Sequence, residues 1–199
     1  MNKGCAYQMK PLFRSIMLED DEKNLIERAK QGDSLAFGAL YDHYLPQIYR
    51  FVYFKVSHRE EAEDITHLVF MKAWQNIAAY IERGFPFSSW LYQISRNQII
   101  DHYRQKKPVA DLEAIEETFF ADLPSLNTDN KFDLFNIRKA LLKLTEDQRD
   151  VIIMHFIDDT SIKDVAIALN KTEGAVRLLQ HRALQSLKRI LKKDNEKSS

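Results

Sequence analysis

A stretch near the middle of the chain, WLYQISRNQIIDHYRQKK at residues 90–107, interleaves aromatic rings with basic side chains. On a helix at about 100° per residue, one stripe carries rings, bases and an isoleucine: Tyr92, Arg96, Ile99, Tyr103 and Lys107. Cations bind phosphate and aromatic faces stack on unpaired bases, so this stripe has the chemistry to hold a single nucleic-acid strand. The opposite stripe is apolar at Trp90 and Ile94 and turns polar by Asn97. Half-buried tyrosines beside a solvated basic helix end are the alternative interpretation.

The residues needed for catalysis or metal binding do not come together in the sequence. Glu63 and His67 stand four residues apart and with Asp64 suggest half a metal site, but the chain has no HExxH motif. Its five glycines include no phosphate-cradling Gly-rich loop. The single cysteine, Cys5, builds neither an internal disulfide nor a Cys-based zinc site. We therefore expect no enzymatic activity, no metal and no cofactor.

Helices must position the interleaved stripe, because the apolar period is helical through most of residues 22–107. A short helix precedes a break, after which a long apolar helix begins near Leu35 with Asp33 or Ser34 as its N-cap. Gly84 and Pro86 later interrupt the pattern. The helix that carries the stripe then restarts at one of two serines, Ser88 or Ser89.

The helix of residues 60–77 is apolar on two faces. One stripe holds small and branched residues: Ala62, Ile65, Val69, Ala73 and Ile77. A second face holds Leu68, Met71 and Trp74, and it also carries Asp64 and His67. Apolar residues on two faces indicate full burial or a partner-binding face, and the acid and the imidazole favour a docking surface.

The composition changes after residue 107. PVADLEAIEETFFADLPSLNTDN is acidic, holds two prolines and has no sustained period, which is typical of a linker. We expect an all-α fold of two small helical domains joined by a flexible acidic linker. The predicted boundaries are an N-terminal tail at 1–21, domains at 22–107 and 131–193, the linker at 108–130 and a C-terminal tail at 194–199.

The second domain contains a helix-turn-helix pattern. In DDTSIKDVAIALNKTEGAVRLLQHRALQSL, the helix signals stop at Leu169 and resume after Thr172, which can N-cap the second helix. The predicted buried stripe of that helix is Val176, Leu179, Ala183, Leu187 and Ile190, and the predicted outward residues are Arg177, Leu178, His181, Gln185 and Lys188. One acid, Glu173, stands among many bases from Lys171 to Lys193, which favours a DNA-reading helix over a structural hairpin with a basic face.

Charge is balanced in total but not in distribution. The 199 residues hold 29 Lys and Arg against 29 Asp and Glu, with acids and bases gathered in separate stretches, which suits a protein with two kinds of partner. No apolar run approaches the roughly 20 residues of a membrane span, and residues 1–17 lack a signal-peptide core, so we expect a cytoplasmic protein. Met17 would be a natural start, which makes residues 1–16 either a mis-assigned start or a short added tail.

Three motifs, in this order, resemble the sigma-70 family and specifically its extracytoplasmic-function (ECF) group. They are EEAEDITHLVFMKAW, PFSSWLYQISRNQIIDHYR and LLKLTEDQRDVIIMHFIDDTSIKDVAIALNKTEGAVRLLQHRAL. The resemblance runs from about Leu25 to Leu191 and is broken only by the linker. It implies that the domains are those called two and four, and that the chain directs promoter-specific initiation by bacterial RNA polymerase.

The resemblance also implies a role for individual residues. The helix of the EDL motif would dock on the β′ clamp helices of core polymerase through Asp64, His67, Leu68 and Met71. The loop before WL and the following helix would capture a flipped base and line the melted minus-ten strand through Tyr80, Arg83, Phe85, Phe87, Tyr92, Gln93, Arg96 and Tyr103. The last helix would read the minus-thirty-five element through Thr172, Arg177, Leu178, His181 and Arg182.

Two positions depart from the family pattern. His67 stands where Gln is usual, which would alter the core contact and make it pH-sensitive. Leu178 and Leu179 stand where many relatives have Ser and Arg, which would change the base preference.

The implied partners are the polymerase core (β′ clamp helices and β flap), promoter DNA and an anti-sigma factor, which commonly restrains ECF relatives. Two alternatives remain open from the sequence. A stand-alone helix-turn-helix regulator would explain the second domain but not the doubly apolar helix or the aromatic-basic stripe. A degenerate relative would bind polymerase or a partner without starting transcription.

Overall fold

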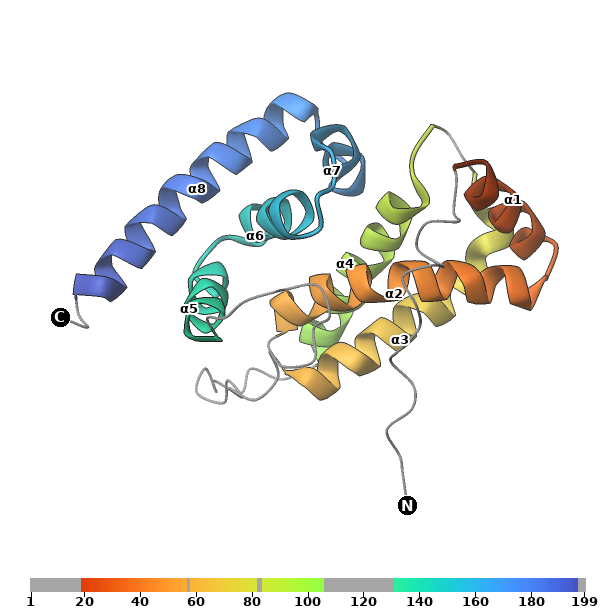
Figure 1. Cartoon of the computed structure of the whole chain (residues 1–199), viewed down its shortest axis with the longest axis horizontal. Coiled ribbons are helices and arrows are strands. Elements are labelled where there is room, and N and C mark those ends of the chain that lie inside the picture. Colours follow the sequence, from red (N-terminus) through yellow and green to blue (C-terminus); the bar gives the residue numbers. More distant parts are fainter. Residues whose placement is uncertain (1–18, 57, 82–83, 106–130, 197–199) are drawn as a thin grey trace, which may run out of the picture.

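The computed structural model describes residues 19–56, 58–81, 84–105 and 131–196, and the described residues form helices and turns with no strand (Figure 1). The helices are α1 (Glu19–Lys30), α2 (Ser34–Val56), α3 (Arg59–Asn76), η1 (Ile77–Ala79), α4 (Phe87–Gln105), α5 (Lys131–Leu142), α6 (Glu146–Ile152), η3 (Ile153–Ile157), α7 (Ile162–Ala168) and α8 (Glu173–Glu196). The expected all-α fold is confirmed. The predicted linker, together with Arg83 and Lys107, lies outside the described residues.

Helices α1 to α4 form a first unit around a shared apolar core. The whole predicted stripe of α3 is buried: Ala62, Ile65, Val69, Ala73 and Ile77. It packs between α2 and α4, because α3 makes its main contacts with these two helices. The helical period of the sequence therefore identified the buried face of α3 correctly.

Local capping explains where α2 starts. Asp33 Oδ1 accepts hydrogen bonds from the backbone N–H groups of Leu35 (3.0 Å) and Ala36 (3.2 Å), as an N-cap side chain does.

The predicted restart of α4 at Ser88 or Ser89 is wrong, because α4 begins at Phe87. The Ser89 N–H already bonds the carbonyl of Pro86 in the first turn, and the Ser89 hydroxyl turns to a different helix.

Helices α5 to α8 form a second unit. Thr145 and Gln148 make a capping box at the start of α6, and Ser161 caps α7 by accepting from the Asp164 N–H. Between α7 and α8 the chain turns at Asn170, whose φ of 52° lies in the left-handed region that Asn tolerates better than most residues. The predicted helix-turn-helix is therefore present as α7, a short turn and α8.

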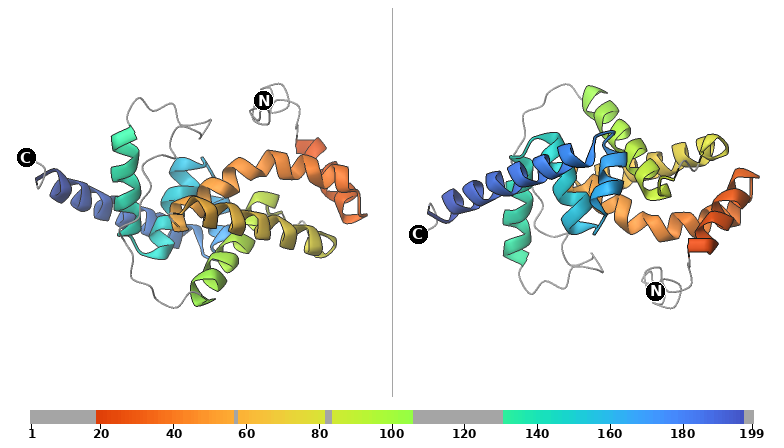
Figure 2. Two further views of the ribbon diagram at one scale, coloured as in Figure 1. Left: turned by 90° about the horizontal axis from the view of Figure 1, so that it is seen from below. Right: turned by 90° about the horizontal axis from the view of Figure 1, so that it is seen from above.

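The two units pack against each other. Contacts join α4 to α7, α2 to α5 and α2 to η3. Figures 1 and 2 show α6 and α7 lying beside α2 and α4, while α8 runs along the edge of the molecule away from α3. The second unit therefore covers one side of the first.

Two leucines of α2 test which face of this helix supports the fold. Leu40 is fully buried, whereas Leu35 is 81% exposed. We expect Leu40→Ala to lower the free energy of unfolding by about 2–5 kcal/mol, because it leaves a cavity in the core. The matched change Leu35→Ala should stay within about 0.5 kcal/mol of the parent. Urea denaturation followed by circular dichroism measures both, and equal losses would contradict this packing of α2.

Candidate polymerase and nucleic-acid interfaces

The outward face of α3 stays uncovered among the described residues. Leu68 is 44% exposed, Met71 43% and Trp74 37%, and the Trp74 ring leans on Phe37 at 4.9 Å between ring centroids. Two further members of the predicted docking face, Asp64 and His67, are also exposed. An exposed apolar strip flanked by an acid and an imidazole has the composition of a protein-interaction site.

Two buried aromatic side chains pack beneath the loop before α4. Tyr80 and Phe87 are buried and stack edge to face at 5.3 Å, and the Tyr80 hydroxyl donates to the carbonyl of Phe85 (3.0 Å). Both rings therefore support the loop in this conformation rather than lining a surface pocket. Phe85 and Ile81 are the apolar side chains that the described part of this loop exposes to solvent.

Tyr92 is a buried residue and not a surface ring. Its ring packs edge to face on Phe51 at 5.0 Å, and its hydroxyl donates to Asp158 Oδ2 (2.8 Å) and accepts from Gln47 Nε2 (2.9 Å). Burial raises the pKa of Tyr92, with the neighbouring Asp158 carboxylate acting in the same direction. In this conformation Tyr92 has no access to DNA.

Gln93 and Arg96, which follow Tyr92 on α4, are also engaged by the second unit. Gln93 Nε2 donates to the carbonyl of Ile167 at the end of α7 (3.0 Å). Arg96 pairs with Asp147 (3.0 Å) and with the buried carboxylate of Asp150 (2.8 Å). Further along, Tyr103 is half exposed and donates to the backbone carbonyl of Lys55 (3.1 Å). The aromatic-basic stripe of the sequence thus faces α6 and α7 over most of its length.

The opposite side of α4 faces a groove that sequence reasoning missed. This groove, of about 650 Å³, lies between α3 and α4 and is lined among others by Lys72, Asn76, Trp90, Asn97, Asp101 and Arg104. Lys72 and Asp101 approach to only 4.0 Å, and Asn97 and Arg104 are exposed. Amides, cations and an indole here offer hydrogen bonds, phosphate contacts and a stacking face. The residue spacing within α4 alone cannot predict the groove, because α3 supplies part of its lining.

Helix α8 presents its predicted faces as expected. Val176 and Ala183 are buried, and Leu179, Leu187 and Ile190 pack partly buried against the core. Thr172 Oγ1 accepts from the Ala175 N–H (3.2 Å) and caps the helix. The predicted reading residues on the other side, Arg177, Leu178, His181 and Arg182, are exposed.

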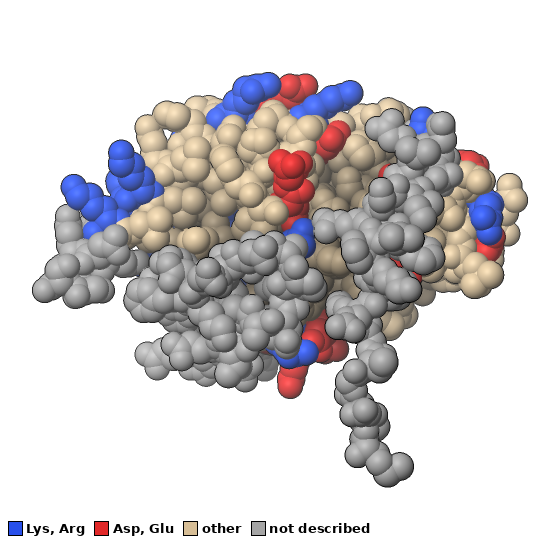
Figure 3. Space-filling view, viewed as in Figure 1, with Lys and Arg blue, Asp and Glu red and all other residues tan. Residues whose placement is uncertain are grey.

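Basic side chains continue along this helix. Figure 3 shows Lys and Arg side chains gathered at the upper left edge of the molecule, which α8 forms. The exposed bases of α8 are Arg177, Arg182, Lys188, Arg189 and Lys192. A basic second helix of a helix-turn-helix is the element that enters a major groove.

Neither a metal centre nor a membrane helix is found in the part of the chain that the structure describes. No group of three or more His, Cys, Asp and Glu side chains comes together there, and none of these helices is long and apolar enough to cross a membrane. Glu63, half of the site considered from the sequence, instead pairs with Arg59 (2.8 Å).

Family models and relatives match both units. Sigma-70 region 2 matches residues 40–109, and Sigma-70, region 4 matches residues 134–187. The ECF RNA polymerase sigma factor SigW of Bacillus subtilis is 34% identical over 183 residues, which cover 85% of this chain and 96% of SigW. The ECF RNA polymerase sigma factor BldN of Streptomyces coelicolor is 31% identical over 173 residues, and the chain spans 66% of its length.

Solved structures agree with the fold. CnrH, in complex with the cytosolic domain of CnrY, matches 88% of this chain and 99% of the solved chain with a TM-score of 0.69 at 22% identity. The sigma factor RpoE of Bartonella quintana, in complex with the anti-sigma factor NepR, matches 78% of this chain and 96% of the solved chain with a TM-score of 0.60 at 25% identity. With both regions present and SigW matched almost end to end, the chain belongs to the ECF group of the sigma-70 family, the RNA polymerase sigma factors that direct transcription initiation.

Proposed function

We propose that this sigma factor binds the polymerase core through the outward face of α3 and reads promoter DNA with α8 and with the surfaces around α4. The observation that carries the proposal is the separation of two exposed surfaces of different chemistry on the two units. One is the apolar and acidic face of α3, and the other is the basic outer face of α8. Residues 22–107 act as domain two and 131–193 as domain four, with 108–130 as linker and tails at 1–21 and 194–199.

The α3 face supports core binding by its composition. Leu68 and Met71 supply apolar area at the centre, while Asp64 and His67 supply polar contacts at the rim. Protein interfaces combine an apolar centre with a polar rim in this way. We assign the β′ clamp helices to this face and the β flap to the second unit, following the family resemblance.

The α8 face supports recognition of the minus-thirty-five element. Arg177 can pair bidentately with guanine, and Leu178 can contact a thymine methyl group, so this helix reads a different base from relatives with Ser at that position. The remaining bases of α8 contact phosphate and fix the register.

The minus-ten element is held around α4 and the loop before it. Extruding a base costs a few kcal/mol, and each base–aromatic stack returns about 1–3 kcal/mol. Phe85 and the groove of Lys72, Asn97 and Arg104 are accessible for this purpose. Tyr92, Gln93 and Arg96 join them only where the second unit moves away.

Further assignments follow from the family. RpoE of Bartonella quintana is bound by an anti-sigma factor, and we extend this kind of partner to the present chain, with the exposed Leu68 and Met71 as its target. The chain acts in the cytoplasm, where RNA polymerase works, and it has no catalytic role of its own. The stand-alone regulator is not favoured, because region 2 is present in addition to the helix-turn-helix.

Run-off transcription with bacterial core polymerase on a genomic-fragment pool tests the function. We expect the protein to create new promoter-specific start sites. The double variant Leu68→Ser with Met71→Ser should lower their yield by about tenfold or more, because it removes the centre of the core interface. Leu35→Ser, the same kind of change at an exposed leucine of α2 outside the assigned interfaces, should have no effect. Unchanged start sites in the double variant would contradict the assigned core face.

Base reading by α8 has its own test. Arg177→Ala should lower the free energy of duplex binding by about 1–3 kcal/mol and relax the base preference at one position. Lys188→Ala should weaken binding to all duplex sequences alike, and it should lower the slope of log affinity against log salt concentration by about one. Selection of binding sites from a random duplex library, with titrations at several salt concentrations, separates the two effects. If both variants weaken binding uniformly, Arg177 is a phosphate contact and not a reader.

A further inference from the structure

The helix that carries the assigned duplex readers begins with an acid. Glu173 is the first residue of α8, and it is the only acid between Lys171 and Lys193. Its side chain is 52% exposed, so the carboxylate lies in solvent on a helix that otherwise presents bases. A carboxylate close to DNA phosphate weakens binding by repulsion. An acid at this position therefore needs a role that offsets this loss.

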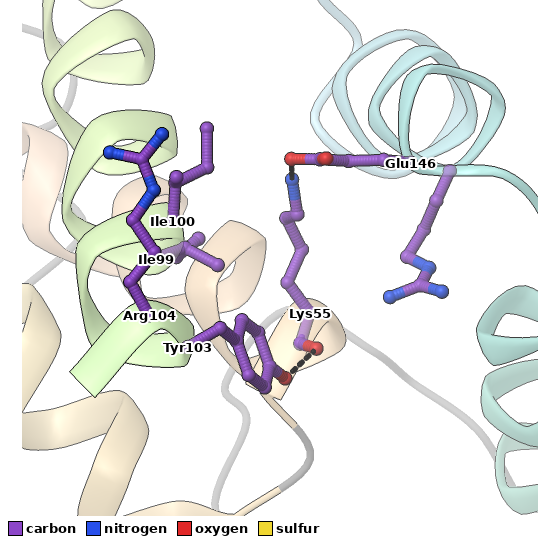
Figure 4. Close-up of a pocket in the computed structure, with 7 residues that line it drawn as sticks. Lys55, Ile99, Ile100, Tyr103, Arg104 and Glu146 are labelled. Atoms are coloured by element: carbon purple, nitrogen blue, oxygen red, sulfur yellow. Dashed lines mark hydrogen bonds and ion pairs between the residues drawn. The ribbon is translucent and has the colours of Figure 1, made fainter. Parts of the chain in front are cut away.

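Other acids of the second unit hold helices together, and Glu173 does not. Glu146, at the start of α6, lies 3.1 Å from Lys55 of α2, and Figure 4 shows this lysine reaching across to it. Asp150 pairs with the same lysine at 2.7 Å. The ion pair that Glu173 makes among the described residues stays within its own helix. Packing between helices therefore does not explain this acid.

Glu173 pairs with Arg177, one turn further along α8. Glu173 Oε2 and Arg177 Nη2 are 3.6 Å apart. The acid stands four residues N-terminal to the base, which is the favourable order for such a pair on a helix. A separation of 3.6 Å is too long for a hydrogen bond, so the carboxylate attracts the guanidinium without occupying its N–H donors. These donors remain available to a base.

The pair determines where the Arg177 guanidinium lies. Side chains of a helix lean towards its N-terminus, so Arg177 covers the first turn of α8, where Glu173 stands. Thr172 caps this turn by accepting from the Ala175 N–H (3.2 Å), and Val176 anchors it in the core. In a helix-turn-helix the N-terminal residues of the second helix contact the base edges. Glu173 therefore keeps the guanidinium at the end of α8 that meets the bases.

An arginine on DNA has two competing binding sites. It can bind guanine O6 and N7 bidentately, or it can bind phosphate, which carries no sequence information. A carboxylate beside the guanidinium disfavours the phosphate site more than the guanine edge, because phosphate carries a full negative charge and the guanine atoms carry partial ones. Orienting the long side chain beforehand also lowers the rotamer entropy lost on binding. Both effects favour the guanine site.

We propose that Glu173 is a positioning residue for base recognition, whose carboxylate holds Arg177 on a guanine of the minus-thirty-five element and keeps it off the phosphate backbone. The proposal rests on the proposed function, because it takes Arg177 as a base reader. Glu173 lowers the total affinity of α8 for DNA and raises the discrimination of α8 between sequences.

Two substitutions separate this role from charge and from helix stability. Glu173→Gln removes the charge at nearly constant size. Glu173→Asp keeps a negative charge at the helix N-terminus, where the helix dipole favours it, but withdraws the carboxylate from Arg177 by one methylene. The matched control is Glu27→Gln, which removes an exposed carboxylate that pairs with Lys30 (2.8 Å) on α1, far from α8 (Figure 1). Circular dichroism verifies that helicity is kept in every variant.

Duplex titrations of the full chain measure the outcome. Selection from a random duplex library first identifies the position at which Arg177→Ala relaxes a preference for guanine. A bidentate arginine–guanine pair discriminates against the wrong base by roughly 5-fold to 150-fold. We expect both Glu173 variants to lower the discrimination at this position by about threefold or more, with other positions unchanged. The slope of log affinity against log salt concentration should steepen by about one, because the released Arg177 binds phosphate. Glu27→Gln should change neither quantity.

A double variant tests whether Glu173 acts through Arg177. Glu173→Gln combined with Arg177→Ala should discriminate at this position as Arg177→Ala alone does, because the interaction that Glu173 supports is already absent. A further loss in the double variant would mean that Glu173 contacts a base itself, and it would overturn the positioning role.

Three other results would also overturn the proposal, each with its own meaning. Tighter binding of all sequences by Glu173→Gln, with unchanged discrimination and with Glu173→Asp behaving as the parent does, would show plain charge repulsion. Loss of discrimination at every position in both variants would show damage to the start of α8. If Arg177→Ala relaxes no base position, the assignment of Arg177 as a reader fails, which is a failure of the proposed function and is distinguishable from the other two results.

Discussion

The carboxylate of Asp150 joins three helices that belong to two different units. It is fully buried at the end of α6, and it lies 2.7 Å from Lys55 on α2 and 2.8 Å from Arg96 on α4. Removing one partner from a buried ion pair typically costs about 3–5 kcal/mol, because the remaining charge stays desolvated. The position of the second unit on the first depends on keeping this cluster complete, and the exposure of α4 depends on that position.

Because the second unit is held on the first, two candidate binding surfaces are exposed to solvent and a third is partly covered. The outer face of α3 and the outer face of α8 are open to solvent in the same structure, on opposite sides of the interface between the units. The strand-facing side of α4 is covered at Tyr92 and Arg96, while its other side opens into the groove with α3. An initiation factor of this shape can meet polymerase and duplex DNA before it exposes all the side chains that hold a melted strand.

Sequence reasoning succeeded where the information is local. The buried and exposed faces of α3 and α8 follow from the helical period, and the caps at Asp33 and Thr172 follow from side chains that bond their own helix start. It did not predict that Tyr92 and Arg96 pair with Asp158 and Asp147, which stand 66 and 51 residues away in the chain. A helical stripe indicates which residues share a face, but it carries no information about which helix will cover that face. The groove beside Asn97 was missed for the same reason.

The distance between the two units tests the account most directly. Cysteines introduced at exposed positions outside the assigned interfaces, Asp42→Cys on α2 and Lys139→Cys on α5, in a chain with Cys5→Ser, allow a donor and an acceptor dye to report that distance by energy transfer. We predict high transfer efficiency in the free protein and a clear drop when core polymerase and promoter DNA are added, because the second unit must leave α4. The same efficiency in the free protein and in a transcriptionally active complex would contradict the account.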